Sequence, residues 1–122
     1  MSVHLTSAPD LCPARPRLWG DLCTTDFATL DPDTTVAVLP VSATEQHGPH
    51  LPLSTDAVIN SGVLHAALAR LPAATATSIL QLPPLAVGDS LEHSAFPGTV
   101  SVDSHALMGL WLAIGIMRSG RV

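Results

Sequence analysis

Residues 35 to 41 read TVAVLPV, a continuous apolar run that is rich in β-branched side chains. Such a run predicts a strand that is buried on both faces, as in a parallel sheet. A helical pattern follows in TDAVINSGVLHAALARL (55–71), and TSILQLPPLAVG (77–88) predicts a second strand bent by its prolines. An apolar helix is expected in DSHALMGLWLAIGIMRSG (103–120). This alternation of strands and helices predicts an α/β fold with a mostly parallel sheet.

The two predicted helices carry specific expectations about capping and burial. In the first, Thr55 can cap the start, Val58, Val63 and Leu64 fall on one side at helical spacing, and Pro72 ends the pattern. The second helix is almost wholly apolar in its middle, which predicts that it is buried, with Ser101 or Asp103 as its cap. A shorter helix is expected within LWGDLCTTDFATL (18–30).

Composition limits the class of protein. The chain has 122 residues, of which 47% are hydrophobic and only 12% charged, enough for one compact domain with a buried core. So few charges predict that another subunit or further chain covers part of the surface, as in a homo-oligomer of the full-length form. A formal net charge of −5, five Lys plus Arg and no tyrosine argue against nucleic-acid binding.

The sequence predicts neither an export signal nor a membrane-spanning segment. Residues 1–17 hold three prolines without periodicity and are expected to form an extended arm ahead of a domain spanning 18–122. They lack the pattern of a secretory signal, and the longest apolar run, about twelve residues, is too short to span a bilayer. Cys12 and Cys23 have no zinc-knuckle spacing and are expected to be free thiols in a reducing cytoplasm.

The stretch TEQHGPHLPLSTD (44–56) gathers acidic and imidazole groups directly after the first strand. In an extended segment residues i and i+2 point the same way, so Glu45 and His47 can face one site. Asp56, at the start of the next helix, can return to it. Such donors suit divalent zinc, manganese or iron, although spacing alone leaves a hydrogen-bonded structural loop equally open.

Two motifs resemble the creatininase family, the creatinine amidohydrolase-like metal hydrolases. LPVSATEQHGPHLPLSTDA (39–57) resembles that family's strand-and-loop motif, and GDSLEHSAFPGTVSV (88–102) resembles its G-x-S…H-x-x-F-P-G-T-x-S stretch. The resemblance covers roughly residues 17 to 122. It implies a creatininase-like layered fold with a mostly parallel central sheet flanked by helices. It also implies hydrolysis of a C–N amide bond, often in a cyclic amide, by a metal-bridging hydroxide.

The resemblance also implies roles for particular residues. Glu45 would bind one divalent ion and His47 the other, while Asp56 would bridge the two, giving two ions of zinc, manganese or iron per full-length site. A second set of residues would lie near the pocket for a small-molecule amide substrate: Ser90, Glu92 and His93. For His93, a hydrogen-bonded loop residue is an equal alternative.

The sequence departs from the family at its C-terminal end. In the family an N-G-H-x-x-N motif supplies further metal ligands, and a later His and Glu transfer protons; none of these precedes Val122. The catalytic residues are therefore expected beyond Val122, in a chain truncated at its C-terminus. Three interpretations stay open: the N-terminal part of an amidohydrolase, an inactive remnant, and a partial, non-catalytic metal-binding module.

Overall fold

The computed structural model describes residues 17–119. The elements follow in this order: β1 (Arg17–Leu18), η1 (Trp19–Asp21), α1 (Thr24–Phe27), β2 (Val36–Val38), α2 (Thr55–Leu68), α3 (Ala73–Thr77), β3 (Ile79–Gln81), η2 (Leu91–His93) and α4 (Ser104–Ser119). Of the predicted arm, 1–16 lies outside the described residues, and Arg17 begins β1. None of the helices within residues 17–119 is long and apolar enough to span a membrane.

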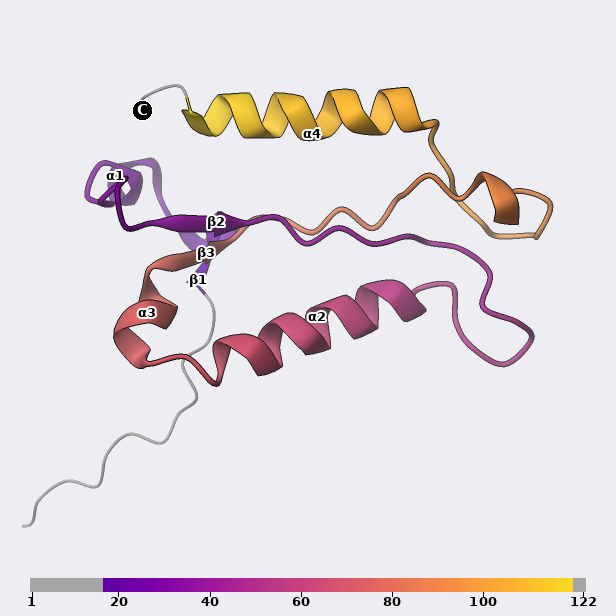
Figure 1. Ribbon diagram of the computed structural model, residues 1–122, viewed down its shortest axis with the longest axis horizontal. Coiled ribbons are helices and arrows are strands. Elements are labelled where there is room, and N and C mark those ends of the chain that lie inside the picture. The colour runs from indigo at the N-terminus through magenta and orange to yellow at the C-terminus, as the bar shows by residue number, and fades with distance from the viewer. Residues whose placement is uncertain (1–16, 120–122) are drawn as a thin grey trace, which may run out of the picture.

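The three strands form a parallel sheet in the order β1-β3-β2. Leu80 at the centre of β3 pairs with Arg17 of β1 on one side and with Ala37 of β2 on the other. The helices α2 and α4 flank this sheet on opposite sides (Figure 1). The predicted α/β class, with a parallel sheet flanked by helices, is confirmed.

The chain stays extended and paired beyond the ends of β2 and β3. Val41 and Leu85 form an isolated parallel bridge, and the Ser42 N–H donates to the Leu85 carbonyl at 2.8 Å. Further along, the Thr44 hydroxyl donates to the Ala86 carbonyl at 2.6 Å. Figure 1 shows the two segments running side by side to one end of the molecule. Because the strands are parallel, both following loops lie at that end, where ligands bind in open α/β sheets.

The buried core of the described residues is small. Its apolar members are Leu68, Ala76, Leu80 and Leu107. Leu80, with 0% of its surface exposed, lies in the central strand β3, between the other two strands. Burial of the sheet therefore centres on β3.

Two predictions of complete burial are wrong. Val36, the first residue of β2, is 51% exposed, because the described chain does not cover the side chain at this end of the strand. The helix α4 buries Leu107, whereas Trp111 and Leu112 are 43% and 59% exposed. The reason is that α4 turns only one narrow side toward the rest of the described chain, so its uniformly apolar sequence exceeds the surface available to cover it.

The helix boundaries also differ from the sequence-based expectations. Thr55 is the first residue of α2 rather than its cap. Its hydroxyl donates to the Pro52 carbonyl at 2.6 Å, whereas a capping side chain accepts a hydrogen bond from a helix N–H. The helix ends at Leu68, well before Pro72, which instead precedes the unpredicted helix α3. On α2, Val58 and Val63 are each 65% exposed, so the predicted apolar side is only partly buried.

Of the two caps expected for α4, the structure has Asp103. The Asp103 carboxylate accepts hydrogen bonds from the backbone N–H groups of His105 and Ala106, both at 3.0 Å. These are the bonds by which an aspartate caps a helix, because they satisfy donors that have no intrahelical partner. The predicted short helix in residues 18–30 is present as two single turns, η1 and α1.

The central position of Leu80 gives a test of this core. We expect Leu80→Ala to lower the free energy of unfolding by about 2–5 kcal/mol, because it removes buried methyl groups and leaves a cavity. The matched substitution Leu112→Ala, on the exposed part of α4, should change it by less than about 0.5 kcal/mol. Urea unfolding followed by circular dichroism measures both. Equal effects would show that β3 is not the centre of the core.

Candidate metal centre

The loop between β2 and α2 folds back on itself like a hairpin. The Glu45 N–H donates to the Leu53 carbonyl at 3.3 Å, and His47 pairs with Leu51 in an antiparallel bridge. Gly48 lies at the turn with a φ of +73°, a conformation that glycine adopts without steric cost. This turn carries the chain back toward Glu45, so that the first turn of α2 begins beside the residues that leave β2.

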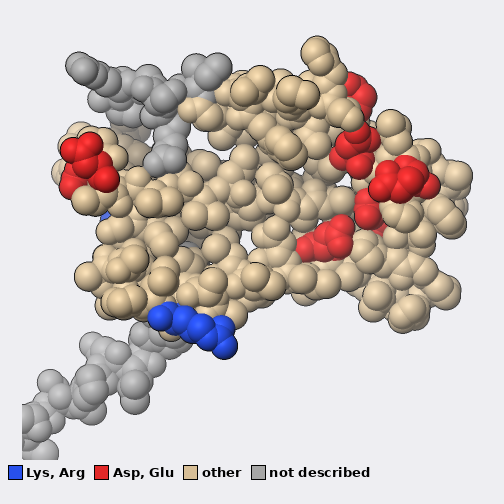
Figure 2. Space-filling view, in the orientation of Figure 1, with Lys and Arg blue, Asp and Glu red and all other residues tan. Residues whose placement is uncertain are grey.

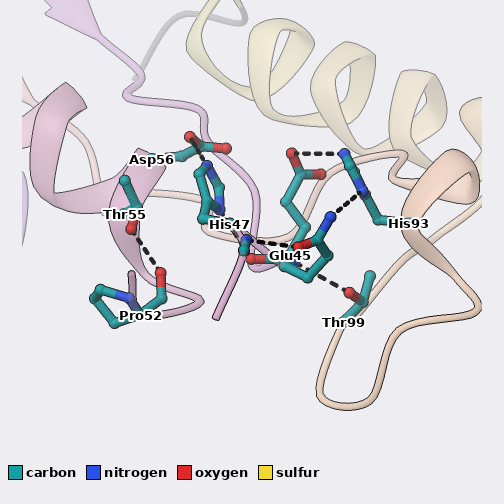
Figure 3. A network of polar contacts seen from close by, with 9 residues as sticks. Glu45, His47, Pro52, Thr55, Asp56, His93 and Thr99 are labelled. Carbon is teal, nitrogen blue, oxygen red and sulfur yellow. Dashed lines mark hydrogen bonds and ion pairs between the residues drawn. The ribbon is translucent and has the colours of Figure 1, made fainter. Parts of the chain in front are cut away.

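The fold-back brings the three predicted ligands together. One ligand atom each from Glu45, His47 and Asp56 lies within 4.8 Å of the others. Zn–N and Zn–O bonds are about 2.0–2.2 Å long, so two such ligand atoms of one ion lie at most about 4.4 Å apart. The three groups are therefore close to the spacing that a metal centre needs. All three residues are partly buried. Figure 3 shows the His47 ring between the Glu45 backbone and the Asp56 carboxylate.

The hydrogen bonds of His47 determine which ring nitrogen can bind a metal. Its Nδ1 lies 3.0 Å from the Glu45 backbone carbonyl, which only accepts, so Nδ1 carries a proton. Its Nε2 lies 2.9 Å from Asp56 Oδ1. A metal-binding histidine typically donates its other N–H to a carbonyl in this way. The arrangement therefore leaves Nε2 of His47 as the ring nitrogen for a divalent ion, with the two carboxylates close by.

Nε2 of His47 lies 2.9 Å from Asp56 Oδ1, so the two side chains form an ion pair when the ring is protonated. The pKa of His47 is raised, chiefly because its ring donates to the Glu45 carbonyl. Partial burial opposes this rise, and the hydrogen bond and charge of Asp56 add to it. In the protonated ring both nitrogens carry protons and face acceptors. A metal ion that binds Nε2 has to displace that proton.

A second group of possible ligands shares Glu45 with the first. One ligand atom each from Glu45, Glu92 and His93 also lies within 4.8 Å of the others. Both Glu92 and His93 belong to η2, which follows the extended segment after β3. The structure thus places these two predicted substrate-site residues beside the predicted ligand Glu45. Figure 2 shows acidic side chains gathered at this end of the molecule, over the loops.

Ser90 lies directly before η2 and is fully buried, with 0% of its surface exposed. Its N–H donates to the Ser101 hydroxyl at 2.8 Å. Its own hydroxyl is a buried side-chain polar atom that has no hydrogen-bond partner among residues 17–119. Such orphaned groups are rare and point to a ligand or to water.

The Phe-Pro-Gly-Thr turn joins the second loop to the first. Thr44 and Val100 form an antiparallel bridge, and the hydroxyl of Thr99 accepts the Gln46 N–H at 3.2 Å. Gly98 has a φ of +89°, and a Cβ there would lie 2.7 Å from Leu53 Cδ1. The sequence pattern marked the turn but gave no role to Gln46 or Thr99. The position of Gln46 between two predicted ligands was the available signal.

Comparison with known proteins gives the family of this chain. The family model described as creatinine amidohydrolase matches residues 20–118. The chain belongs to the creatininase family. This family is metal-dependent, and the described residues include a group able to hold a metal ion.

The chain is similar to proteins named mycofactocin precursor peptide peptidase. The protein of Mycolicibacterium smegmatis is 42% identical over 80 residues, 66% of this chain and 32% of the relative. Those of Mycobacterium ulcerans and Mycobacterium tuberculosis are each 38% identical, over 79% of this chain and 40% of the relative. This creatininase-family chain therefore spans between 32% and 40% of the length of the relatives it matches.

The raised pKa of His47 predicts a pH dependence of stability in the metal-free chain. Protonated His47 stabilises the fold fully below its unfolded-state pKa of about 6.5, and this stabilisation is lost as pH rises through the higher folded pKa. We expect the urea midpoint to fall as pH rises above about 6.5. In Asp56→Asn the fall should be smaller but still present, because the hydrogen bond to the Glu45 carbonyl is the largest cause of the raised pKa and is kept.

The control for this experiment is His50→Asn, which removes an exposed imidazole from the same loop. It should keep the wild-type dependence on pH. An identical fall in wild type and Asp56→Asn would show that the His47–Asp56 pair is not formed in solution.

Proposed function

We propose that this chain forms the metal-binding wall of a creatininase-family amidohydrolase that cleaves a C–N amide bond. The observation that carries the proposal is the convergence of Glu45, His47 and Asp56, whose ligand atoms lie within 4.8 Å of one another in a chain of this family. The hydrogen bond from Nδ1 of His47 to a backbone carbonyl supports it, because it leaves Nε2 as the ligand atom.

The proposed site takes two divalent ions of zinc, manganese or iron, with Asp56 as the shared ligand. Glu45 would bind one ion and His47 the other. When bound, the ions supply Lewis-acid activation of the amide carbonyl and of water. The chain's own residues hold the ligand atoms in place: the hairpin-like loop fixes Glu45 relative to His47, and the start of α2 fixes Asp56.

We propose a peptide as the substrate class. The relatives' name, mycofactocin precursor peptide peptidase, supports this choice over a small cyclic amide. An open groove of about 550 Å³ also supports it, because Asp56 lies on its lining together with apolar residues of α2, including Ile59, Val63 and Leu64. A peptide side chain could lie along this apolar surface while its amide bond reaches the ligands.

Ser90, Glu92 and His93 are proposed to lie on the substrate side of the site. Ser90 is fully buried directly before η2, which supports a role in holding Glu92 and His93 at this side of the site. The proximity of Glu92 and His93 to Glu45 supports their place at the edge of the metal centre.

We further propose that the protein works in the cytoplasm as a homo-oligomer. The free, exposed thiol of Cys23 supports a reducing compartment. Exposed apolar side chains on α2 and α4, such as Val58 and Leu112, support subunit contacts, because exposed apolar surface can mark an interaction site.

Metal binding is the first test of this function. We expect the purified chain to bind zinc and manganese, measured by calorimetry and by elemental analysis after dialysis. Asp56→Ala should lose all bound ions, because the shared ligand is removed, whereas Glu45→Ala should chiefly empty one position. His50→Ala, a loop histidine outside both groups, should bind like wild type. Equal losses in Asp56→Ala and Glu45→Ala would argue against Asp56 as the bridge.

Turnover separates the enzyme from its alternatives. The zinc- or manganese-loaded chain is incubated with a set of short peptides and with creatinine, and C–N cleavage is followed by mass spectrometry. Cleavage of a peptide that stops on chelation supports the proposal. Cleavage together with bound metal would refute the inactive remnant, and a chain that binds no metal would favour it.

Ser90 gives a test that does not depend on the metal. We expect Ser90→Ala to leave the free energy of unfolding unchanged or to raise it by up to about 1 kcal/mol, because a buried hydroxyl without a partner destabilises the fold. Ser101→Ala, which removes the acceptor for the Ser90 N–H, should instead destabilise the fold. A loss of stability in Ser90→Ala would indicate a bonded hydroxyl.

A further inference from the structure

His93 lies across Glu45 from His47, and its two ring nitrogens face different neighbours. Nε2 is 3.8 Å from Glu45 Oε1, and Nδ1 is 3.3 Å from the side-chain nitrogen of Gln46 (Figure 3). A histidine beside a metal-binding carboxylate can serve as a ligand or as a donor to that carboxylate. Which of the two it is depends on the nitrogen that carries the proton.

The orientation of the Gln46 amide decides this question. The Gly48 N–H donates to Gln46 Oε1 at 2.6 Å. An amide NH₂ group cannot accept that bond, so the oxygen must face Gly48 and the NH₂ group must face His93. The backbone of Gln46 is held as well, because its N–H donates to the Thr99 hydroxyl at 3.2 Å. Gln46 is thus fixed at its backbone and at both atoms of its amide.

It follows that Nδ1 of His93 accepts a hydrogen bond and that the neutral ring carries its proton on Nε2. A protonated ring nitrogen has no lone pair for a metal ion. His93 is therefore unsuited to act as a ligand through Nε2, although its group with Glu45 and Glu92 has a compatible size. Instead, the Nε2–H points at the carboxylate of Glu45.

We propose that His93 is a positioning residue for the metal ligand Glu45 and that Gln46 sets its tautomer. The separation of 3.8 Å is longer than a hydrogen bond, so the attraction is between the N–H dipole and the carboxylate charge. The two side chains are only 28% and 17% exposed, which strengthens this attraction relative to water. The inference rests on the proposed function, in which Glu45 binds the metal.

The tautomer is measured directly on the metal-free chain by long-range ¹H–¹⁵N correlation of the histidine rings. At alkaline pH, where the ring is neutral, we expect His93 with a protonated Nε2 and a bare Nδ1. In Gln46→Glu the side chain offers only acceptors, so the proton should move to Nδ1. A protonated Nδ1 in the wild-type chain would overturn the inference.

Zinc affinity tests the positioning role itself. His93→Gln keeps an N–H donor that can reach Glu45, whereas His93→Met has a similar length and no donor. By competition with a chromophoric chelator, we expect His93→Met to bind zinc about 10–100-fold more weakly and His93→Gln to stay within about threefold of wild type. Equal affinities in the two variants would overturn the positioning role.

The two experiments distinguish a failure of the proposed function from a failure of this inference. A wild-type chain that binds no zinc overturns the proposed function. A wrong tautomer in the metal-free chain, or equal behaviour of His93→Gln and His93→Met in a chain that binds zinc, overturns this inference and leaves the proposed function standing.

Discussion

The parallel pairing that continues beyond β2 and β3 is the constraint on which the site depends. Thr44 is its last link, because its hydroxyl donates to the Ala86 carbonyl and its own carbonyl accepts the Val100 N–H at 2.9 Å. Thr44 is therefore tied to the extended segment after β3 and to the segment after the Phe-Pro-Gly-Thr turn. Glu45 follows directly, so the first predicted ligand is fixed where the three segments meet.

Much of the fold follows from local patterns. The β-branched run of residues 35–41 and the helical spacing after Thr55 each correspond to an element of the structure. Burial was harder to predict, since it depends on what lies against each face. The sequence of α4 has apolar residues all round, but the described chain covers only the side that bears Leu107. An apolar pattern reports what a helix could bury, whereas its neighbours determine what it does bury.

The candidate site, too, could be predicted from the sequence only in part. The alternation of an extended chain was enough to predict that Glu45 and His47 face one site, and the helix start supplied Asp56. Gln46 could not be assigned, because its partners His93 and Thr99 are 47 and 53 residues away in the chain. Only the contacts between distant segments show that Gln46, which lies between two predicted ligands, orients the side chain of His93.

The two histidines of the site show how one residue type is given opposite tasks. For His47, a backbone carbonyl accepts the hydrogen bond of Nδ1–H, so Nε2 is the nitrogen left for a metal ion. For His93, an amide donor occupies Nδ1, so the proton faces Glu45. Both partners come from the segment Glu45–Gln46, one from its backbone and one from its side chain. Two adjacent residues thus set the protonation of both rings, and a change in this short segment would alter the ligand and its support together.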